Sequence, residues 1–304
     1  MNEPARSEFW TSYQPGFRFS DHRVGTDEFF SEVEAHRYGL EPHIPEVVRF
    51  ERWSGAEVLE AGCGIGTDGA RFARMGARYT GMDESDTALA LARRRFRGEG
   101  LEGEFARGSV TALPFGDASF DLVYSHGVIH HIPETGRAVE EFARVLRPGG
   151  TAIVMLYHRD SLNYRVNIML IRRALAAALA IPGATGAIAA ATGERRSVLE
   201  GHRELLREHG ARYLTDAQLF LSNNTDGPGN PLSKVYSRGE MGELFAPFDR
   251  VETAVRFLNL RLLPGGDRIA RTGFARRLER RWGWHLYVSA TKSSATESRN
   301  LSGR

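Results

Sequence analysis

Short apolar runs alternate with amphipathic helical stretches from residue 56 onward. Helical patterns such as SDTALALARRRF (85–96) and TGRAVEEFARVLRPGG (135–150) separate these runs. Strands that alternate with helices are typical of βαβ units, so the pattern predicts a parallel sheet covered by helices. Five strands are predicted in this part of the chain: AEVLEA (56–61), RYTGMD (78–83), GEFARGS (103–109), FDLVYSHG (120–127) and TAIVMLYH (151–158).

The alternation is interrupted between residues 159 and 235. Two helix-like stretches, YRVNIMLIRRALAAALA (164–180) and SVLEGHRELLREHG (197–210), precede a loop rich in turn formers, SNNTDGPGNPLSK (222–234). We interpret this region as an inserted helical cap. The sheet then resumes with a helix, two more strands and an intervening helical segment: SRGEMGELFAPF (237–248), DRVETAVRFLNLRL (249–262), WHLYVSAT (284–291) and DRIARTGFARRLERRW (267–282).

The organisation predicted from these patterns has four parts. A helical segment, with an amphipathic helix around residues 26–38, occupies residues 1–50 and is expected to lie over the functional site. The core consists of residues 51–158 and 236–292, with the cap at 159–235 between its two pieces. Residues 293–304 are small and polar and are predicted to form a disordered tail.

Composition restricts the class of protein further. The chain has 40 basic and 38 acidic residues, a net charge of +2, so no overall basic field is expected. Its single cysteine, Cys63, excludes an internal disulfide and a cysteine-based zinc site, which favours a reducing, cytoplasmic setting. The N-terminus lacks the pattern of a signal peptide. Arg172, Arg173 and Pro182 interrupt the most apolar stretch (166–192), so no membrane span is expected.

A glycine loop in VLEAGCGIGTDGARFARMG (58–76) is the first candidate for chemistry. Gly62, Gly64 and Gly66 stand two apart, directly between an apolar run and a helical pattern. Such a loop brings backbone N–H groups and a helix N-terminus together, which suits an anionic group or a nucleoside cofactor. The dinucleotide fingerprint requires glycine where this chain has Thr67, so the spacing points to another cofactor.

The block EAGCGIGT, together with the acidic residue in TGMDES (80–85), resembles the cofactor-binding motifs of class I S-adenosylmethionine-dependent methyltransferases. ALPFGDASFDLVYSHGVIHHI (112–132) and FARVLRPGGTAIVML (142–156) extend the resemblance, which covers 56–158 closely and 236–292 loosely. The core resembles the small-molecule, methyltransferase-11-like type. This implies an α/β, Rossmann-like, seven-stranded and mostly parallel sheet with helices on both faces. It also implies S-adenosylmethionine as cofactor and S-adenosylhomocysteine as product.

The resemblance further implies roles for individual residues. The glycines would let the backbone approach the methionine part of the cofactor, and Glu60 would help to hold its amino group. Asp83 would accept hydrogen bonds from both ribose hydroxyls, with Glu84 beside the ribose and adenine. Ser109 stands where the family usually has an acidic residue, so the N–H of Val110 is expected to contribute to adenine recognition. The complete implied cofactor site is Glu60, Gly62, Cys63, Gly64, Gly66, Asp83, Glu84, Ser109, Val110, Ser125 and His126.

Methyl transfer chiefly requires that acceptor and methyl group are held close together without intervening water. An oxygen acceptor or a protonated nitrogen acceptor also requires a base. His130 and His158 follow the fourth and fifth strands and are the base candidates, with Tyr157 beside them, whereas His131 is predicted to be structural. Asn163 and Tyr164, with Asn223 and Asn224 of the cap loop, are predicted to contact the acceptor, while Asp226 is interpreted as a turn residue. No metal-ligand spacing is present, so no metal is predicted.

We therefore predict methylation of a small molecule, for which a secondary metabolite is one candidate. The apolar cap helix would suit a hydrophobic acceptor or a homodimer contact, and packing on the core is an equal alternative. A second function is RNA methylation through the arginine-rich segment 268–281, although a charged helix is usually a solvated face and RNA is not favoured. A third is a cofactor-binding protein without catalysis.

Overall fold

The fold centres on a seven-stranded sheet in the order β3-β2-β1-β4-β5-β7-β6. The computed structural model describes residues 9–12, 16–259 and 272–294. All neighbouring pairs from β3 to β5 are parallel, and β7 runs antiparallel to both β5 and β6. The predicted seven-stranded, mostly parallel sheet is thereby confirmed. Its strands are β1 (Glu57–Ala61), β2 (Arg78–Asp83), β3 (Glu104–Arg107), β4 (Phe120–His126), β5 (Leu146–Tyr157), β6 (Arg250–Arg256) and β7 (His285–Thr291).

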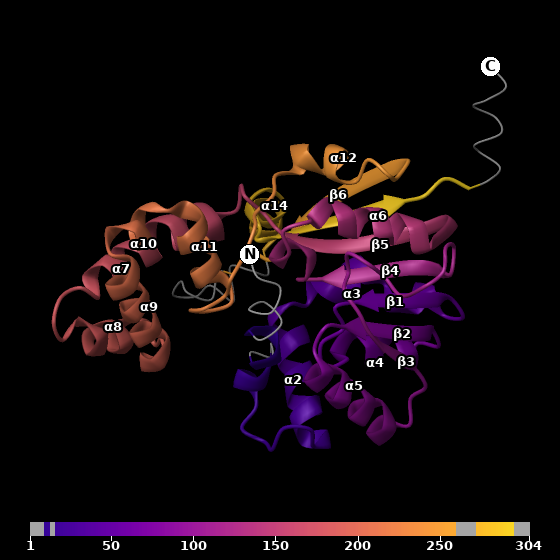
Figure 1. The fold of residues 1–304 in the computed structure, drawn as a ribbon, viewed down its shortest axis with the longest axis horizontal. Coiled ribbons are helices and arrows are strands. Elements are labelled where there is room, and N and C mark those ends of the chain that lie inside the picture. The colour runs from indigo at the N-terminus through magenta and orange to yellow at the C-terminus, as the bar shows by residue number, and fades with distance from the viewer. Residues whose placement is uncertain (1–8, 13–15, 260–271, 295–304) are drawn as a thin grey trace.

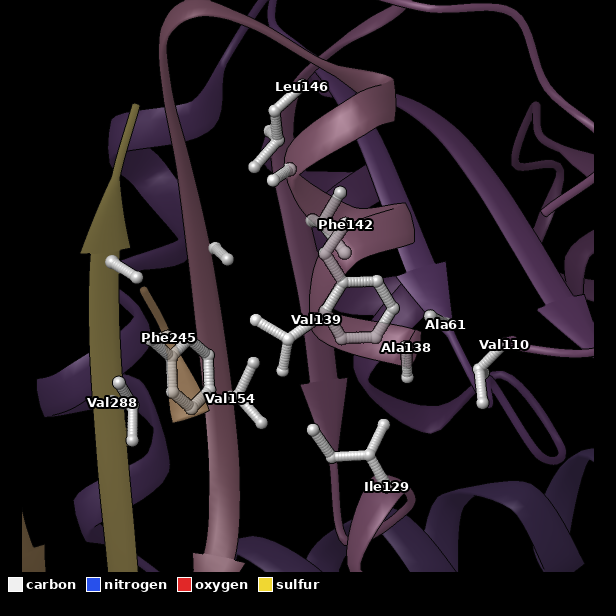
Figure 2. Packing of buried hydrophobic residues seen from close by; sticks show 14 of the residues in the cluster. Ala61, Val110, Ile129, Ala138, Val139, Phe142, Leu146, Val154, Phe245 and Val288 are labelled. Carbon is white, nitrogen blue, oxygen red and sulfur yellow. The ribbon is translucent and has the colours of Figure 1, made fainter. Parts of the chain in front are cut away.

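Helices cover both faces of this sheet (Figure 1). Successive side chains of a strand point to opposite faces, so Leu59 packs with α6 (Thr135–Val145) and α12 (Met241–Leu244). Figure 2 shows this cluster, with Val139 and Phe142 of α6 against the strands. Val58 belongs to the cluster on the other face, with residues of α3 (His43–Val48), α4 (Thr67–Arg74) and α5 (Asp86–Glu99).

The N-terminal part of the chain packs beside α4 and α5. Its main element, α2 (Asp27–Leu40), begins where the side chain of Thr26 accepts a hydrogen bond from the N–H of Phe29. The carboxylate of Asp68, in the first turn of α4, accepts a bond from Nε of Arg37 at 2.8 Å and is 2% exposed. This buried ion pair attaches α2 to the core. Short 3₁₀ turns flank these helices: η1 (Phe17–Phe19) and η2 (Phe50–Trp53).

The cap forms a separate group of helices at one end of the sheet (Figure 1). A π-helix, η4 (Asn163–Arg172), continues into α7 (Arg173–Ala178). The chain leaves and re-enters the core side by side, because Tyr236 donates its N–H to the carbonyl of Tyr157 and accepts from the N–H of Arg159. The remaining cap helices are α8 (Ala184–Thr192), α9 (Arg196–His209), α10 (Ala211–Thr215) and α11 (Ala217–Thr225).

Several predicted boundaries are wrong. Residues 222–225 belong to α11 and not to a loop, because the carboxylate of Asp216 caps this helix at the N–H groups of Gln218 and Leu219. The helix predicted over 135–150 ends at Val145, and β5 begins at Leu146, which pairs with Phe120. The helix predicted over 237–248 is limited to η5 (Arg238–Glu240) and α12.

Some predictions extend beyond the described residues. The helical segment 267–282 is described from residue 272 and contains α14 (Gly273–Trp282), whereas 267–271 lie outside. Residues 260–262 of the predicted sixth strand and 295–304 of the tail also lie outside, as do 1–8 and 13–15 of the N-terminal segment. Within the part of the chain that is described, none of the helices combines the length and apolar character needed to cross a membrane.

Candidate cofactor and acceptor site

A pocket opens where β1, β2, β3 and β4 end. Open α/β sheets bind their ligands at this carboxyl edge. The loops after β1 and β3 and the end of β2 contribute Gly62, Gly64, Met82, Asp83, Glu84, Gly108 and Val110. The end of β4 and the turn that follows contribute His126, Gly127, Val128, His131 and Ile132, and Trp10 of the N-terminal segment completes the lining.

Two glycines of the loop after β1 differ in what their missing side chains would meet. Gly62 has φ +85°, and a Cβ there would lie 2.3 Å from Cγ2 of Val128, so the fold itself requires glycine. Gly64 has φ +52°, and a Cβ there would meet nothing within 4 Å. Gly64 lines the pocket, so its backbone faces open space that a ligand can occupy. The loop therefore fits a cofactor that approaches the backbone closely.

Asp83 ends β2 and presents its carboxylate at the pocket. Oδ2 accepts a hydrogen bond from the N–H of Gly64, and Oδ1 accepts one from the N–H of Ser85, each at 2.9 Å. Burial raises the pKa of Asp83, although these two N–H groups act in the opposite direction. A carboxylate oxygen has more than one lone pair, so Asp83 can still accept bonds from two ligand hydroxyls.

Other residues of the predicted cofactor site support the pocket from behind. The carboxylate of Glu60 is buried and accepts a hydrogen bond from the Tyr79 hydroxyl at 2.6 Å. Burial raises its pKa well above the ordinary value, and the negative charge of Asp68 adds to this. The predicted residues that line the pocket are Gly62, Gly64, Asp83, Glu84, Val110 and His126, and those outside the lining are Glu60, Cys63, Gly66, Ser109 and Ser125.

The three candidate histidines occupy different environments. His131 lines the pocket, and its ring lies 4.8 Å from that of Trp10. His130 is fully buried away from the lining, with its ring 3.9 Å from that of Tyr157. His158 is also buried and outside the lining, with Nδ1 3.0 Å from the carbonyl of Gly283. His131 thus lines the pocket, whereas His130 and His158, the two predicted base candidates, lie outside its lining.

The residues predicted to contact the acceptor do not line the pocket, and their side chains make contacts within the cap and the apolar cluster. Asn224 uses its amide inside the cap, where it donates to the carbonyl of Phe220 and the hydroxyl of Tyr213. Asn223 accepts the N–H of Gly229 and donates to the carbonyl of Leu219. Asn163 accepts a bond from Asn167, and Tyr164 packs with the apolar cluster beneath the cap.

Tyr157, predicted as catalytic, points toward the cap and not into the pocket lining. Its ring stacks on that of Trp284, with centroids 4.3 Å apart, and its hydroxyl donates to the carboxylate of Asp226 at 3.2 Å. Asp226 in turn lies 3.5 Å from Nε2 of His131. Sequence reasoning missed this pair: adjacent histidines give no signal as to which one faces a pocket, and an Asp-Gly-Pro-Gly segment has the pattern of a turn. Trp10 carried no signal beyond being aromatic.

The parallel-sheet core brings a glycine loop and an acidic strand end together at one pocket, an arrangement suited to a nucleoside cofactor. Residues 59–154 match the family described as methyltransferase domain. Residues 59–154 therefore form a class I S-adenosylmethionine-dependent methyltransferase domain, as the sequence motifs predicted. S-adenosylmethionine is the cofactor of this class.

Curated relatives resemble the core of the chain. A methyltransferase, GfsG, of Streptomyces halstedii is 40% identical over 105 residues, which cover 34% of this chain and 38% of that protein. A phthiotriol/phenolphthiotriol dimycocerosates methyltransferase of Mycobacterium tuberculosis is 41% identical over 98 residues, covering 32% of this chain and 36% of that protein. The chain thus spans little more than a third of the length of these relatives.

One solved structure resembles nearly the whole chain in fold. Magnesium protoporphyrin IX methyltransferase from Synechocystis, with bound S-adenosylhomocysteine, matches with a TM-score of 0.52 and 13% identity. The match covers 96% of this chain and 100% of that one. At this identity, the similarity concerns the fold alone.

Proposed function

We propose that this protein transfers a methyl group from S-adenosylmethionine to a small-molecule acceptor. The observation that carries the proposal is the pocket shared by Gly64 and Asp83, which combines open space beside a backbone with a carboxylate at a strand end. The names of the curated relatives, which describe methyltransferases, support it.

Different residues of the pocket would contact different parts of the cofactor. Asp83 would accept hydrogen bonds from the ribose hydroxyls, and the loop at Gly64 would lie against the methionine part. Val110 would lie near the adenine, with its N–H available as a donor. When bound, the cofactor supplies a methyl group on a positively charged sulfur, an electrophile that needs no activation by the protein.

The chain's main catalytic contribution is then to position the acceptor and exclude water. Trp10, Val128 and Ile132 give the pocket an apolar wall, which favours a small, partly hydrophobic acceptor over a polymer. We assign acceptor binding to the region between this wall and the cap, residues 159–235, and cofactor coverage to the N-terminal segment, residues 1–50. Holding the reacting atoms in line at contact distance accounts for much of the expected acceleration. The free, buried thiol of Cys63 is compatible with a cytoplasmic setting.

Calorimetric titration with S-adenosylhomocysteine tests the proposal without knowledge of the acceptor. We expect binding of one ligand per chain. Asp83→Ala removes an acceptor of charge-assisted hydrogen bonds and should weaken binding by about tenfold or more. Asp86→Ala is the matched control, because that nearby carboxylate is 72% exposed and contacts Arg107. Absence of binding by the unchanged protein, or equal affinities for the two variants, would contradict the proposal.

A further inference from the structure

The cap carries a row of exposed apolar side chains along its first helix. Five of the eight large hydrophobic residues that are exposed in the described part of the chain fall within residues 162–181, and we call them the exposed row: Leu162, Val166, Leu170, Ile171 and Ile181. Leu162, Val166 and Leu170 stand four positions apart, close to one helical turn, so they lie along one side of the helix. Single exposed apolar side chains are normal on a protein surface, whereas a row of them indicates a binding face.

The opposite side of the same helix already packs inside the protein. Ile168 of η4 is 1% exposed and belongs to the apolar cluster beneath the cap. Ala176 of α7 and Leu179, which follows it, are also buried. Within the described residues, none of the side chains of the exposed row belongs to an apolar cluster. The helix is therefore apolar on two sides, and the described part of the chain covers only one of them.

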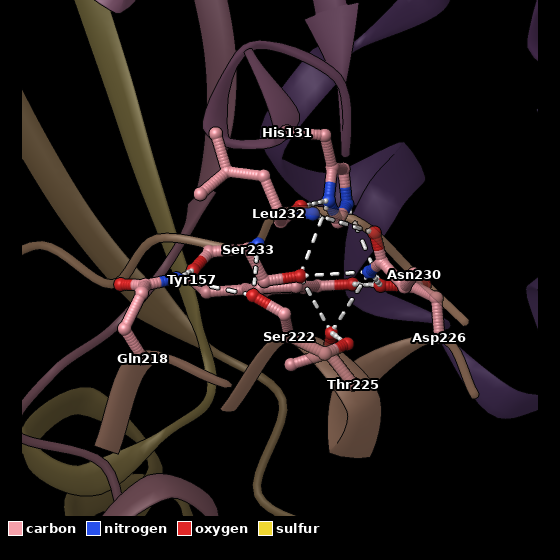
Figure 3. Close-up of polar contacts among 9 residues, drawn as sticks. All are labelled: His131, Tyr157, Gln218, Ser222, Thr225, Asp226, Asn230, Leu232 and Ser233. Carbon is pink, nitrogen blue, oxygen red and sulfur yellow. Dashed lines mark hydrogen bonds and ion pairs between the residues drawn. The ribbon is translucent and has the colours of Figure 1, made fainter. Parts of the chain in front are cut away.

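A polar network holds the cap on the sheet, and Figure 3 shows its centre. The amide of Asn230 donates to the hydroxyl oxygen of Ser233 at 2.9 Å, and Nδ1 of His131 lies 2.7 Å from the carbonyl oxygen of Leu232. His131 belongs to the 3₁₀ turn η3 (Ile129–His131), so these contacts join the segment that returns from the cap to the end of β4. The exposed row takes no part in this network, and docking of the cap on the sheet does not account for it.

The sequence around the exposed row is rich in arginine and poor in acidic residues. Residues 160–196 contain five arginines and two acidic residues, whereas the whole chain has 40 basic and 38 acidic residues. No acidic residue stands between 161 and 193. The balance of charge that holds for the chain as a whole therefore does not hold for this part of the cap.

The two carboxylates of this region leave its positive charge in excess. Asp160 forms an ion pair with Arg165, which is 64% exposed, and Glu194 lies 4.0 Å from Arg172. Arg173 has no carboxylate partner among the residues that the structure describes, and two of its nitrogens are buried without a hydrogen bond. Two carboxylates cannot neutralise five guanidinium groups, so this part of the cap keeps a net positive charge.

An apolar row bordered by positive charge matches the surface of an anionic lipid bilayer. Amphipathic helices that lie at such a surface place apolar side chains at the boundary of the acyl chains and basic side chains near the headgroups. A second copy of this chain is a poorer match, because a symmetric contact would bring the same arginine-rich region of two subunits together. The combination of exposed row and excess arginine therefore favours lipid over self-association.

We propose that the exposed row docks on the surface of a membrane that contains anionic phospholipids. The helix formed by η4 and α7 lies along the surface, with Leu170, Ile171 and Ile181 in the interface and Arg165 at the level of the headgroups. This inference goes beyond the proposed methyltransferase function, because lipid binding requires neither cofactor nor acceptor. Its failure would leave the proposed function untouched.

Flotation of the full chain with lipid vesicles tests the proposal directly. The anionic probe is phosphatidylcholine with about one third phosphatidylglycerol, and pure phosphatidylcholine is the neutral probe. We expect binding to the anionic vesicles that is about tenfold or more tighter than binding to the neutral ones and that weakens as salt is added. Failure of the unchanged protein to bind the anionic vesicles, or equal binding to both kinds, would overturn the proposal.

A double variant, Leu170→Gln with Ile181→Gln, tests the apolar part of the contact. It replaces the two most exposed side chains of the row, at 64% and 62%, and should weaken binding to anionic vesicles by about tenfold or more. Met75→Gln is the control, because Met75 is a large hydrophobic residue, 42% exposed, that follows α4 outside the cap. We expect it to bind within about twofold of the unchanged protein. Equal affinities of the double variant and Met75→Gln would show that the exposed row does not contact lipid.

Arg165→Gln tests the electrostatic part of the contact. It removes an exposed positive charge beside Val166 and should weaken binding to anionic vesicles by about fivefold. Arg78→Gln is the matched control, because Arg78 is 60% exposed and also pairs with a carboxylate, that of Glu57 at the start of β1. Anionic vesicles bound equally well by the two arginine variants would contradict a role for the charge of the cap.

Analytical ultracentrifugation and thermal unfolding complete the comparison. We expect the Tm of each variant to stay within about 3 °C of that of the unchanged protein, since every replaced side chain is at the surface. A dimer of the unchanged protein that dissociates in the double variant, without any binding to vesicles, would assign the exposed row to a second copy of the chain and overturn the lipid assignment.

Discussion

At the scale of single residues, several of the predicted cofactor residues lie in the pocket lining, whereas the predicted acceptor residues of the cap do not. Gly62, Gly64 and Asp83 follow directly from the ends of β1 and β2, so their place at the carboxyl edge is a local consequence of strand assignment. The orientation of His131 is not local. It depends on a single 3₁₀ turn and on a carbonyl 101 positions further along the chain, at Leu232.

Replacement of the two pocket glycines should affect different properties, cofactor affinity at Gly64 and stability at Gly62. In Gly64→Ala the new Cβ enters space that the cofactor would use, so affinity for S-adenosylhomocysteine should fall by about tenfold or more. The left-handed backbone at this position should cost only about 1–2 kcal/mol of unfolding free energy. In Gly62→Ala the Cβ meets Val128 at 2.3 Å, which should cost about 3 kcal/mol or more.

Calorimetry and urea unfolding of the two glycine variants separate these effects. Each variant serves as the control for the other, because both introduce the same methyl group at positive φ in the same loop. Unchanged affinity in Gly64→Ala would mean that the cofactor does not approach this part of the backbone.

At the scale of elements, the apolar runs predicted the positions of β1 to β5. A strand buried on both faces produces a short apolar run with polar or turn-forming residues before and after it. Helix ends were less predictable. The start of α11 depends on capping by Asp216. The helix extends to Thr225, so Asn223 and Asn224, residue types common in loops, are helical and buried. The end of α6 depends on pairing of Leu146 with Phe120, a contact between segments that the pattern treats separately.

The cap should make stability depend on pH through His202 of α9. Burial, together with the charge of Arg172, lowers the pKa of His202 to about 4. Below about pH 6.5 the unfolded chain gains a proton at this residue and the folded cap does not, so His202 makes the protein less stable as pH falls from 6.5 toward 4. This contribution reaches roughly 2–3 kcal/mol at pH 4.5.

His202→Asn should remove that contribution. The difference in unfolding free energy between variant and unchanged protein, measured in urea from pH 7.5 to 4.5, should shift in favour of the variant as pH falls. The fixed cost of losing the contact with the Tyr213 hydroxyl is the same at every pH and cancels in this comparison. His22→Asn, at a side chain 55% exposed, is the surface control. A difference that does not change with pH would show that burial of His202 does not affect its protonation.

At the scale of the whole molecule, the sequence established the core and its cofactor class but left the position of the cap open. The segment that returns from the cap is held by two backbone hydrogen bonds, from Tyr236 to Tyr157 and from Lys234 to His130, which help to fix the position of Asp226. These bonds join residues about 80 to 100 positions apart in the sequence. The acceptor side of the site is therefore a tertiary feature. If the cap contacts the acceptor, as we propose, acceptor choice depends on how core and cap assemble, whereas the cofactor motifs are local in the sequence.

The overall charge should also exclude RNA as a tightly bound acceptor. Nonspecific binding to nucleic acid depends on many basic contacts, and 40 basic residues are nearly balanced by 38 acidic ones. We expect anisotropy titrations with bulk transfer RNA at about 50 mM salt to give a dissociation constant weaker than about 10 μM. Replacing Arg276 and Arg277 of α14 by glutamate should change it little, since an isolated basic helix supplies few phosphate contacts. Submicromolar binding that falls steeply with salt and is lost in this double variant would instead favour RNA methylation.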